Sequence, residues 1–140
     1  MAVTAQERKL LLDGDWIETG EWHEVRSPYS GEVVGRVPRA GGDEARRAVD
    51  AAAAAMADPL PAYRRAEILE RTADLIADRQ EEIASTISAE AGKPMKAARV
   101  EADRAVSTYR SAATEARNAA AAANAAAERA DRMFQKGLRK

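Results

Sequence analysis

The chain has 140 residues, the length of one domain, and its 22 basic and 23 acidic side chains leave a net charge of -1. This balance gives no overall field to attract nucleic acid or an anionic membrane, and the absence of cysteine excludes disulfides, zinc-thiolate sites and thiol nucleophiles. Much of the 46% hydrophobic fraction is alanine, which buries little area, so we expect a thin core.

The N-terminal sequence has no long apolar run after its first charges, and no later stretch approaches the ~18 consecutive apolar residues of a membrane span. Cysteine-free sequences also suit a reducing compartment. We therefore expect a cytoplasmic protein with neither a membrane nor a nucleic acid as partner.

The predicted elements begin, after a flexible N-terminus over residues 1–8, with a β unit over residues 9–37. Residues 10–12 and 15–17 are apolar runs around Asp13-Gly14, a dipeptide typical of tight hairpin turns. A second pair of strands, over 22–26 and 32–37, flanks the turn-rich residues 27–31.

Three helices are predicted after the β unit. The first covers residues 43–57, where Asp43 can cap the helix, and its apolar positions are Ala45, Val49, Ala52 and Met56. The second covers residues 61–90, begins at Pro61 and ends near Gly92 and Pro94. Its apolar face comprises Leu60, Ile68, Thr72, Leu75, Ile76, Ile83 and Ile87.

The last helix begins at residue 95, extends over 95–117 and continues without a break into an alanine-rich extension over 118–140. Apolar residues recur in steps of four and three, which predicts a coiled-coil seam. This seam comprises Ala98, Ala102, Ala105, Tyr109, Ala112, Ala116, Ala119, Ala123, Ala126, Ala130 and Met133. A helix of this length exceeds the diameter of a compact domain, so self-association through the seam is expected.

The predicted fold class is therefore α+β and mostly α, with short antiparallel hairpins followed by three helices. The apolar side chains of the second helix need cover. We expect Ile68, Leu75, Ile76 and Ile83 to pack on the first helix and on the early part of the long one.

Residues 8–117 resemble the N-terminal segment of NAD(P)-dependent aldehyde dehydrogenases. The resemblance rests on four segments in register, which are 12–17 (LDGDWI), 27–38 (SPYSGEVVGRVP), 43–52 (DEARRAVDAA) and 64–69 (RRAEIL). It is sharpest at 90–94 (EAGKP), followed by Glu101, which is similar to the family's "ExGKPxxxAxxEV" segment.

This resemblance implies NAD(P)-dependent oxidation of aldehydes to acids for an intact member, with NAD or NADP as cofactor. It also implies that the first helices pack on a dinucleotide-binding sheet. The family's catalytic cysteine, general-base glutamate, oxyanion-hole asparagine and dinucleotide-binding strands come later in the chain than this segment. We therefore expect no catalytic, cofactor-binding or metal-binding residue here, no small-molecule substrate, and no activity for the chain alone.

The end of the chain, residues 118–140, resembles the C-terminal helix of alanine-zipper outer-membrane lipoproteins, which also ends in Arg-Lys as residues 139–140 do. Those lipoproteins carry a lipidated cysteine that this chain lacks. A truncated dehydrogenase, a fusion and a non-natural sequence are all compatible with the two resemblances, and any role of Lys140 stays open.

Two glycine-containing segments suggest phosphate binding at first sight. Gly92-Lys93 lacks the earlier glycine and the following Ser or Thr of a phosphate-binding loop, since Ile87 and Pro94 occupy those places. Gly41-Gly42 could present backbone N–H groups to an anion, but we expect it to be a simple helix-entry turn.

Other polar and aromatic residues favour structural interpretations. His23 is the single histidine, which excludes a histidine metal cluster, and Glu81, Glu82, Glu90 and Glu101 are expected on solvated helix surfaces. Trp16 and Trp22 are expected to anchor the small sheet. The sequence thus supports two hypotheses: a non-catalytic dehydrogenase segment, or a structural helical module that self-associates through its alanine heptads.

Overall fold

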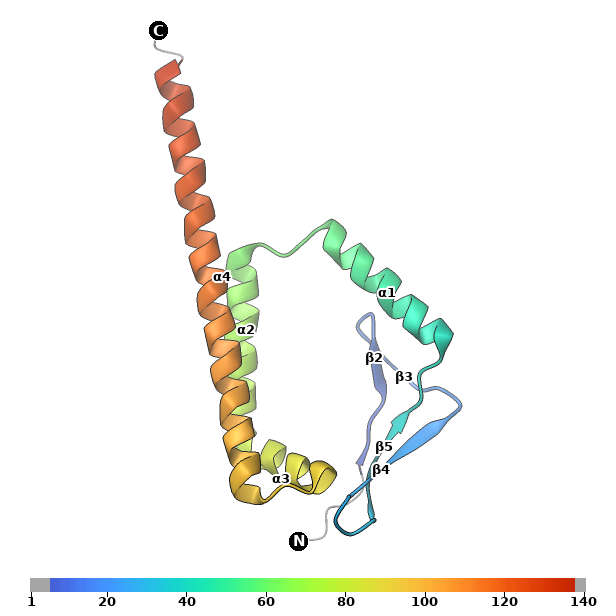
Figure 1. Cartoon of the computed structure of the whole chain (residues 1–140). Helices are drawn as coiled ribbons and strands as arrows, with labels where there is room; N and C mark the ends of the chain where they lie inside the picture. Colours follow the sequence, from blue (N-terminus) through green and yellow to red (C-terminus); the bar gives the residue numbers. More distant parts are fainter. Residues whose placement is uncertain (1–5, 138–140) are drawn as a thin grey trace. The chain divides into compact units, whose positions relative to one another are not determined.

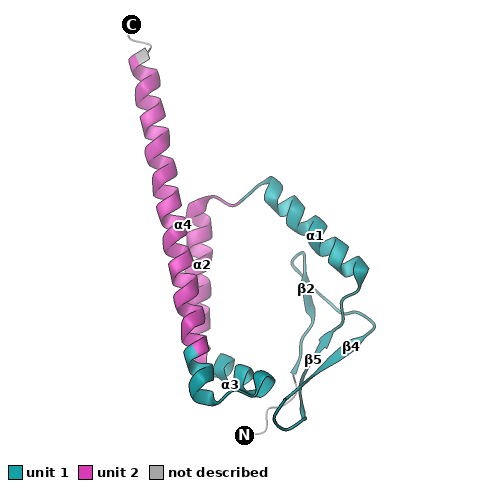
Figure 2. Ribbon diagram, viewed as in Figure 1, with its two compact units in different colours: residues 1–59, 81–100 teal, residues 60–80, 101–140 magenta. Residues whose placement is uncertain are grey.

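The structure is a computed structural model that describes residues 6–137 (Figure 1). Five short strands precede four helices in this range, and the last helix is by far the longest. The predicted class, α+β and mostly α with N-terminal hairpins and a long final helix, is confirmed. The described residues form two compact units, residues 6–59 with 81–100 and residues 60–80 with 101–137 (Figure 2).

The first unit contains the predicted hairpins. Strands β2 (Leu10–Leu12) and β3 (Asp15–Ile17) pair antiparallel. Both turn residues between them have positive φ, 53° at Asp13 and 86° at Gly14, as a type I′ turn requires. This turn chemistry explains why an Asp-Gly dipeptide stands between the two strands.

A three-stranded sheet in the order β1-β5-β4 completes the β part of this unit. β4 (Trp22–Arg26) and β5 (Val33–Pro38) pair antiparallel, whereas β1 (Gln6–Glu7) pairs parallel with β5. β1 falls within the segment predicted to be flexible; residues 1–5 of that segment lie outside the described range. Both β1 side chains are exposed, so the strand is held by its backbone bonds to β5 and not by an apolar pattern.

Helix α1 (Gly42–Ala57) has Gly41 at its N-cap, not Asp43 as predicted. The predicted apolar side of α1 is exposed, with relative accessibilities of 68% at Val49 and 72% at Met56. No residue of this helix is fully buried. Its contact with the rest of the unit is made instead through the side facing β2, where Ala51 is half-buried.

The predicted helix over 61–90 is two helices, α2 (Ala62–Asp78) and α3 (Gln80–Ala91), interrupted at Arg79. Neither Gly nor Pro stands at this break. Interactions of the flanking residues hold it in place: Gln80 donates a hydrogen bond to Asp103 in the second unit, and Glu81 pairs with Arg99 at 2.8 Å in the first.

The second unit is a helical hairpin in which α2 lies antiparallel to α4 (Met95–Gly137), as Figure 1 shows. Ion pairs join Asp74 to Arg110 and Glu70 to Arg117, so residue numbers rise along α4 as they fall along α2. The buried side chains of this unit are all small: Ala66, Ala73, Ala102, Val106 and Ala113. They let the two helices approach closely, but they supply little apolar area per residue.

This packing corrects the expectation for the second helix. Ile68 is 48% exposed and Leu75 is 45% exposed, whereas Ala66 and Ala73 are buried. Only Ile76 and Ile83 of the four residues expected to find cover are half-buried. In α2, therefore, the alanine side and not the isoleucine side faces α4.

The coiled-coil seam is occupied only in part. Ala98 and Ala102 are buried as predicted, but Val106 and Ala113 are buried next, while Tyr109 is 38% exposed. A straight helix drifts by about 20° per heptad, so the stripe covered by α2 moves away from a strict seven-residue repeat. From Ala119 onward every predicted seam residue is exposed.

Candidate functional site

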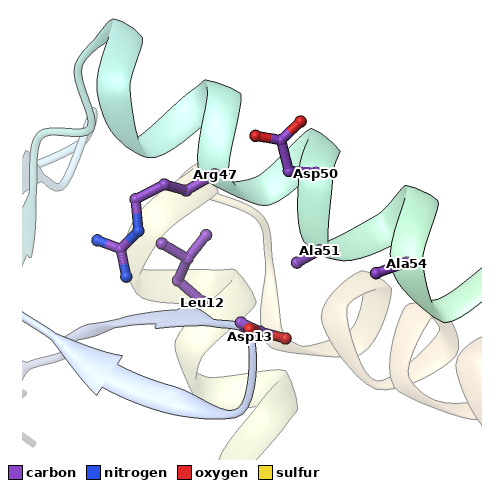
Figure 3. Close-up of a pocket in the computed structure, with 6 residues that line it drawn as sticks. All are labelled: Leu12, Asp13, Arg47, Asp50, Ala51 and Ala54. Atoms are coloured by element: carbon purple, nitrogen blue, oxygen red, sulfur yellow. The ribbon is translucent and has the colours of Figure 1, made fainter.

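A groove between the first hairpin and α1 is a surface depression of the first unit (Figure 3). Leu12 and Asp13 line it from the hairpin, and Arg47, Asp50, Ala51 and Ala54 line it from α1. Leu12 is buried and points toward α1, whereas the carboxylate of Asp50 points away from the hairpin (Figure 3). No polar groups converge on one point in this groove, so its arrangement is that of a packing contact between a hairpin and a helix.

The N-terminus of α1 is the second candidate, because Gly41-Gly42 could present N–H groups to an anion. The Glu44 carboxylate already accepts the Gly41 N–H at 2.8 Å, and Asp43 in the same turn pairs with Arg46. The bond from Gly41 lowers the pKa of Glu44 below its usual value of 4.5. The helix thus supplies its own anion at this end, and the interpretation as a helix-entry turn holds.

A pH-dependent contribution to stability follows from this cap. Since the folded-state pKa of Glu44 is depressed, its contribution is fully present above the unfolded value of 4.5 and is lost as the pH falls through the folded value. We expect Glu44→Gln to destabilise the chain at neutral pH. As the pH falls and Glu44 of the wild type becomes protonated, the difference in stability between the wild type and the variant should become smaller. Thermal unfolding midpoints measured from about pH 3 to 6 check this. Glu32→Gln, on an exposed turn, is the control; equal pH profiles for wild type and Glu44→Gln would contradict the assignment.

The joint between α3 and α4 is the third candidate. Gly92 has φ +65°, and the Ser88 hydroxyl donates to the Lys93 carbonyl at 2.7 Å. A Cβ added at Gly92 would lie 3.0 Å from Cγ of Pro28, in the turn between β4 and β5. This segment is a helix C-terminal cap packed against a turn, and it is not an open phosphate-binding loop.

The charged residues singled out in the sequence do not gather in one place. His23 is exposed on β4 opposite Val37. Glu81 pairs with Arg99, whose guanidinium lowers the pKa of that carboxyl, while Glu90 is exposed and Glu101 half-buried on separate helices. Among residues 6–137, no group of three or more His, Asp or Glu residues could hold a metal ion.

The tryptophans do not anchor a core as expected. Trp16 is 63% exposed beside its cross-strand neighbour Leu11, which is 60% exposed, and Trp22 is 40% exposed. Sequence reasoning also missed the contact between Gly92 and Pro28, since it joins two motifs more than 60 positions apart in the chain. Both motifs were visible in the sequence, but nothing in their spacing indicates that they touch.

Comparison with known proteins identifies the origin of these features. Residues 16–136 match the model of the aldehyde dehydrogenase family. The chain belongs to the aldehyde dehydrogenase family. The match continues past Arg117, where the sequence resemblance had been expected to stop, so the helix after residue 117 is part of the family match. A likeness to alanine-zipper lipoproteins is not needed to account for it.

Individual relatives agree with this membership. The chain is 37% identical over 106 residues to lactaldehyde dehydrogenase of Methanocaldococcus jannaschii, covering 74% of this chain and 23% of that protein. It is 36% identical over 102 residues to glutarate-semialdehyde dehydrogenase of Pseudomonas aeruginosa, covering 67% and 20%. The crystal structure of an NAD-dependent aldehyde dehydrogenase from Sinorhizobium meliloti superposes with a TM-score of 0.78 at 36% identity, covering 83% of this chain and 24% of that one.

The chain therefore spans about a quarter of the length of the dehydrogenases it matches. Its described residues do not form a dinucleotide site. At the N-terminus of α1, Glu44 already accepts the Gly41 N–H and Asp43 pairs with Arg46. The groove beside it offers one cation, Arg47, next to the carboxylate of Asp13, so no step of a reaction is assigned to these residues. None of the helices in the described range combines the length and hydropathy of a membrane span.

Proposed function

We propose that this chain is a structural segment of an NAD(P)-dependent aldehyde dehydrogenase and that it does not oxidise aldehydes by itself. The observation that carries the proposal is the family match over 16–136 in a chain that spans only about a quarter of its relatives. The sites described above are consistent with a purely structural role, because none of them brings together a nucleophile, a base and a place for a dinucleotide. In a complete enzyme this segment would support the oxidation of an aldehyde to an acid by NAD or NADP.

The exposed apolar side chains support this role. Val49 and Met56 of α1, and Ile68 and Leu75 of α2, are between 45% and 72% exposed. Large apolar side chains on amphipathic helices normally lie under cover. In the proposal, the dinucleotide-binding sheet of the enzyme would provide this cover. A cytoplasmic location is part of the proposal, supported by the cysteine-free sequence.

The test uses the purified 140-residue chain with a panel of short aliphatic, hydroxy- and semialdehydes and with NAD and NADP in turn. We expect no aldehyde-dependent formation of NADH or NADPH and no saturable thermal shift with either nucleotide. Ala73→Asp, which places a carboxylate at a fully buried position of α2 and should unfold the chain, controls for contaminating dehydrogenase. Turnover that appears in the wild type and disappears in this variant would overturn the proposal.

Self-association through α4 is a second candidate function, and one observation favours it. The seam residues from Ala119 to Met133 are exposed, and Phe134 beside them is 65% exposed. A helix with an apolar stripe and no cover in its own chain is suited to pairing with another helix. In this alternative the chain is a structural module whose partner is a second copy of itself.

A further inference from the structure

The distal part of α4 differs from the rest of the helix in what covers it. α2 lies alongside the earlier part of α4, past the ion pair of Glu70 with Arg117, and Ala102, Val106 and Ala113 are buried on the side that faces α2. Beyond that, the apolar side continues through Ala119, Ala123, Ala126 and Ala130 and ends at Met133 and Phe134, 74% and 65% exposed. The apolar stripe that α2 leaves exposed thus ends in two large side chains.

The charges beside this stripe are the second observation. Glu115, Arg129 and Lys136 flank the seam on one side, since each lies three residues after a seam residue. None of the three forms an ion pair with another residue in the range 6–137. Of the other charges on this part of α4, Arg117 pairs with Glu70 and Arg132 with Glu128 at 3.6 Å, whereas Asp131 directly follows Ala130 on the other side of the seam. On the side of the seam that Glu115, Arg129 and Lys136 share, the unpaired charges are thus acidic at one end of the stripe and basic at the other.

We propose that residues 116–133 pair antiparallel with the same residues of a second copy of this chain; the inference rests on the self-association described above and adds its orientation and register. Ala116 would then lie opposite Met133 of the second copy, Ala119 opposite Ala130, and Ala123 opposite Ala126. The large Met133 side chain would then lie opposite the small Ala116 side chain, where it fills space that a pair of alanines would leave open. The paired stretch of 18 residues is roughly 27 Å long.

Charge complementarity selects this orientation. Each seven-residue repeat has two seam residues, and the position immediately before the first of them flanks the seam. In an antiparallel coiled coil these flanking positions of the two helices face one another across the interface. In this register they bring Glu115 between Arg129 and Lys136 of the second copy, and the two-fold axis repeats the arrangement at the other end. A parallel, in-register pair would instead place the acidic ends together and the basic ends together, with no opposite charge across the seam.

Cysteine cross-linking tests the orientation, because the chain has no cysteine of its own. Copies with Ala119→Cys are mixed with copies with Ala130→Cys and oxidised. We expect the mixed disulfide to exceed either symmetric product several-fold, since only opposed positions approach within disulfide geometry. A predominant symmetric product at Ala119→Cys would show a parallel pair and overturn the orientation while leaving self-association intact.

Charge exchange tests the register. By sedimentation analysis, Glu115→Lys should weaken dimerisation by about tenfold, and adding Arg129→Glu and Lys136→Glu should restore it. Glu128→Lys, on the opposite side of the helix, is the matched control and should leave dimerisation within about twofold. No recovery in the triple variant would overturn the register. A monomeric wild type at about 100 µM would overturn self-association and the inference together, but not the proposed dehydrogenase segment, which the activity assay tests separately.

Discussion

Gly92→Ala is expected to destabilise the first unit by about 2–3 kcal/mol, in two parts that separate variants can resolve. Gly92 has φ +65°, and placing a residue with a Cβ in the left-handed region costs about 1–2 kcal/mol. The new methyl group would lie 3.0 Å from Cγ of Pro28, so the turn or the joint must shift, which adds about 1 kcal/mol or more. Chemical denaturation measures the sum.

Two other glycines provide matched controls for Gly92→Ala. Gly31 has φ +73° but no atom within 4 Å of an added Cβ, so Gly31→Ala should pay only the conformational cost. Gly20 has neither feature and should tolerate alanine almost without effect. The expected order of destabilisation is Gly92, then Gly31, then Gly20. Equal effects at Gly92 and Gly31 would show that the contact with Pro28 does not constrain the joint.

Ala73→Leu is expected to destabilise the second unit by about 1–3 kcal/mol, the usual cost of inserting bulk into a close-packed core. Ala73 is fully buried on α2, where the helix lies beside α4, and the neighbouring buried side chains are also small. A leucine would force the two helices apart and would lengthen the ion pairs of Asp74 with Arg110 and of Glu70 with Arg117. Circular dichroism during urea unfolding measures the loss.

Ala121→Leu is the control for Ala73→Leu, because it makes the same chemical change at an exposed position of α4. Leucine and alanine have similar helix propensities, so the change should stay within about 0.5 kcal/mol. If Ala73→Leu were equally neutral, the alanine contact between α2 and α4 would not be close-packed. If it were stabilising, the site would hold a cavity that leucine fills.

Sequence reasoning succeeded where local chemistry determines the structure. The hairpin at Asp13-Gly14 follows from a turn that requires positive φ at both central residues, and the end of α3 follows from Gly92 and Pro94. The long final helix follows from alanine propensity. Each of these features depends on residues that are neighbours in the chain.

The features that sequence reasoning missed depend on residues far apart in the chain. β1 exists because β5 offers an edge to Gln6 and Glu7, and the interruption at Arg79 coincides with the boundary between the two units. The side of α2 that is buried was misjudged because hydrophobicity favours the isoleucines, whereas close approach to α4 favours Ala66 and Ala73. Strength of hydrophobic character and fit to a neighbouring helix are different properties, and only the first can be read from a single segment.

The same distinction applies to the candidate sites. The phosphate-loop interpretation of Gly92-Lys93 failed on motif spacing alone, and the structure adds that a Cβ at Gly92 would press against Pro28 in the turn between β4 and β5. The Gly41-Gly42 segment required the structure, because its sequence does not reveal that Glu44 folds back onto the Gly41 N–H. Local motifs could therefore propose these sites, and the hydrogen bonds of the folded chain were needed to choose between their interpretations.

The most direct test of the central claim is calorimetric titration of the purified chain with NAD and with NADP, followed by an assay of the same sample with aldehydes. A structural segment of the family, with carboxylates in the first turn of α1, should give no saturable heat with either nucleotide and no aldehyde-dependent reduction of it. Saturable binding near one nucleotide per chain, with turnover that follows the folded fraction of the protein, would contradict the claim.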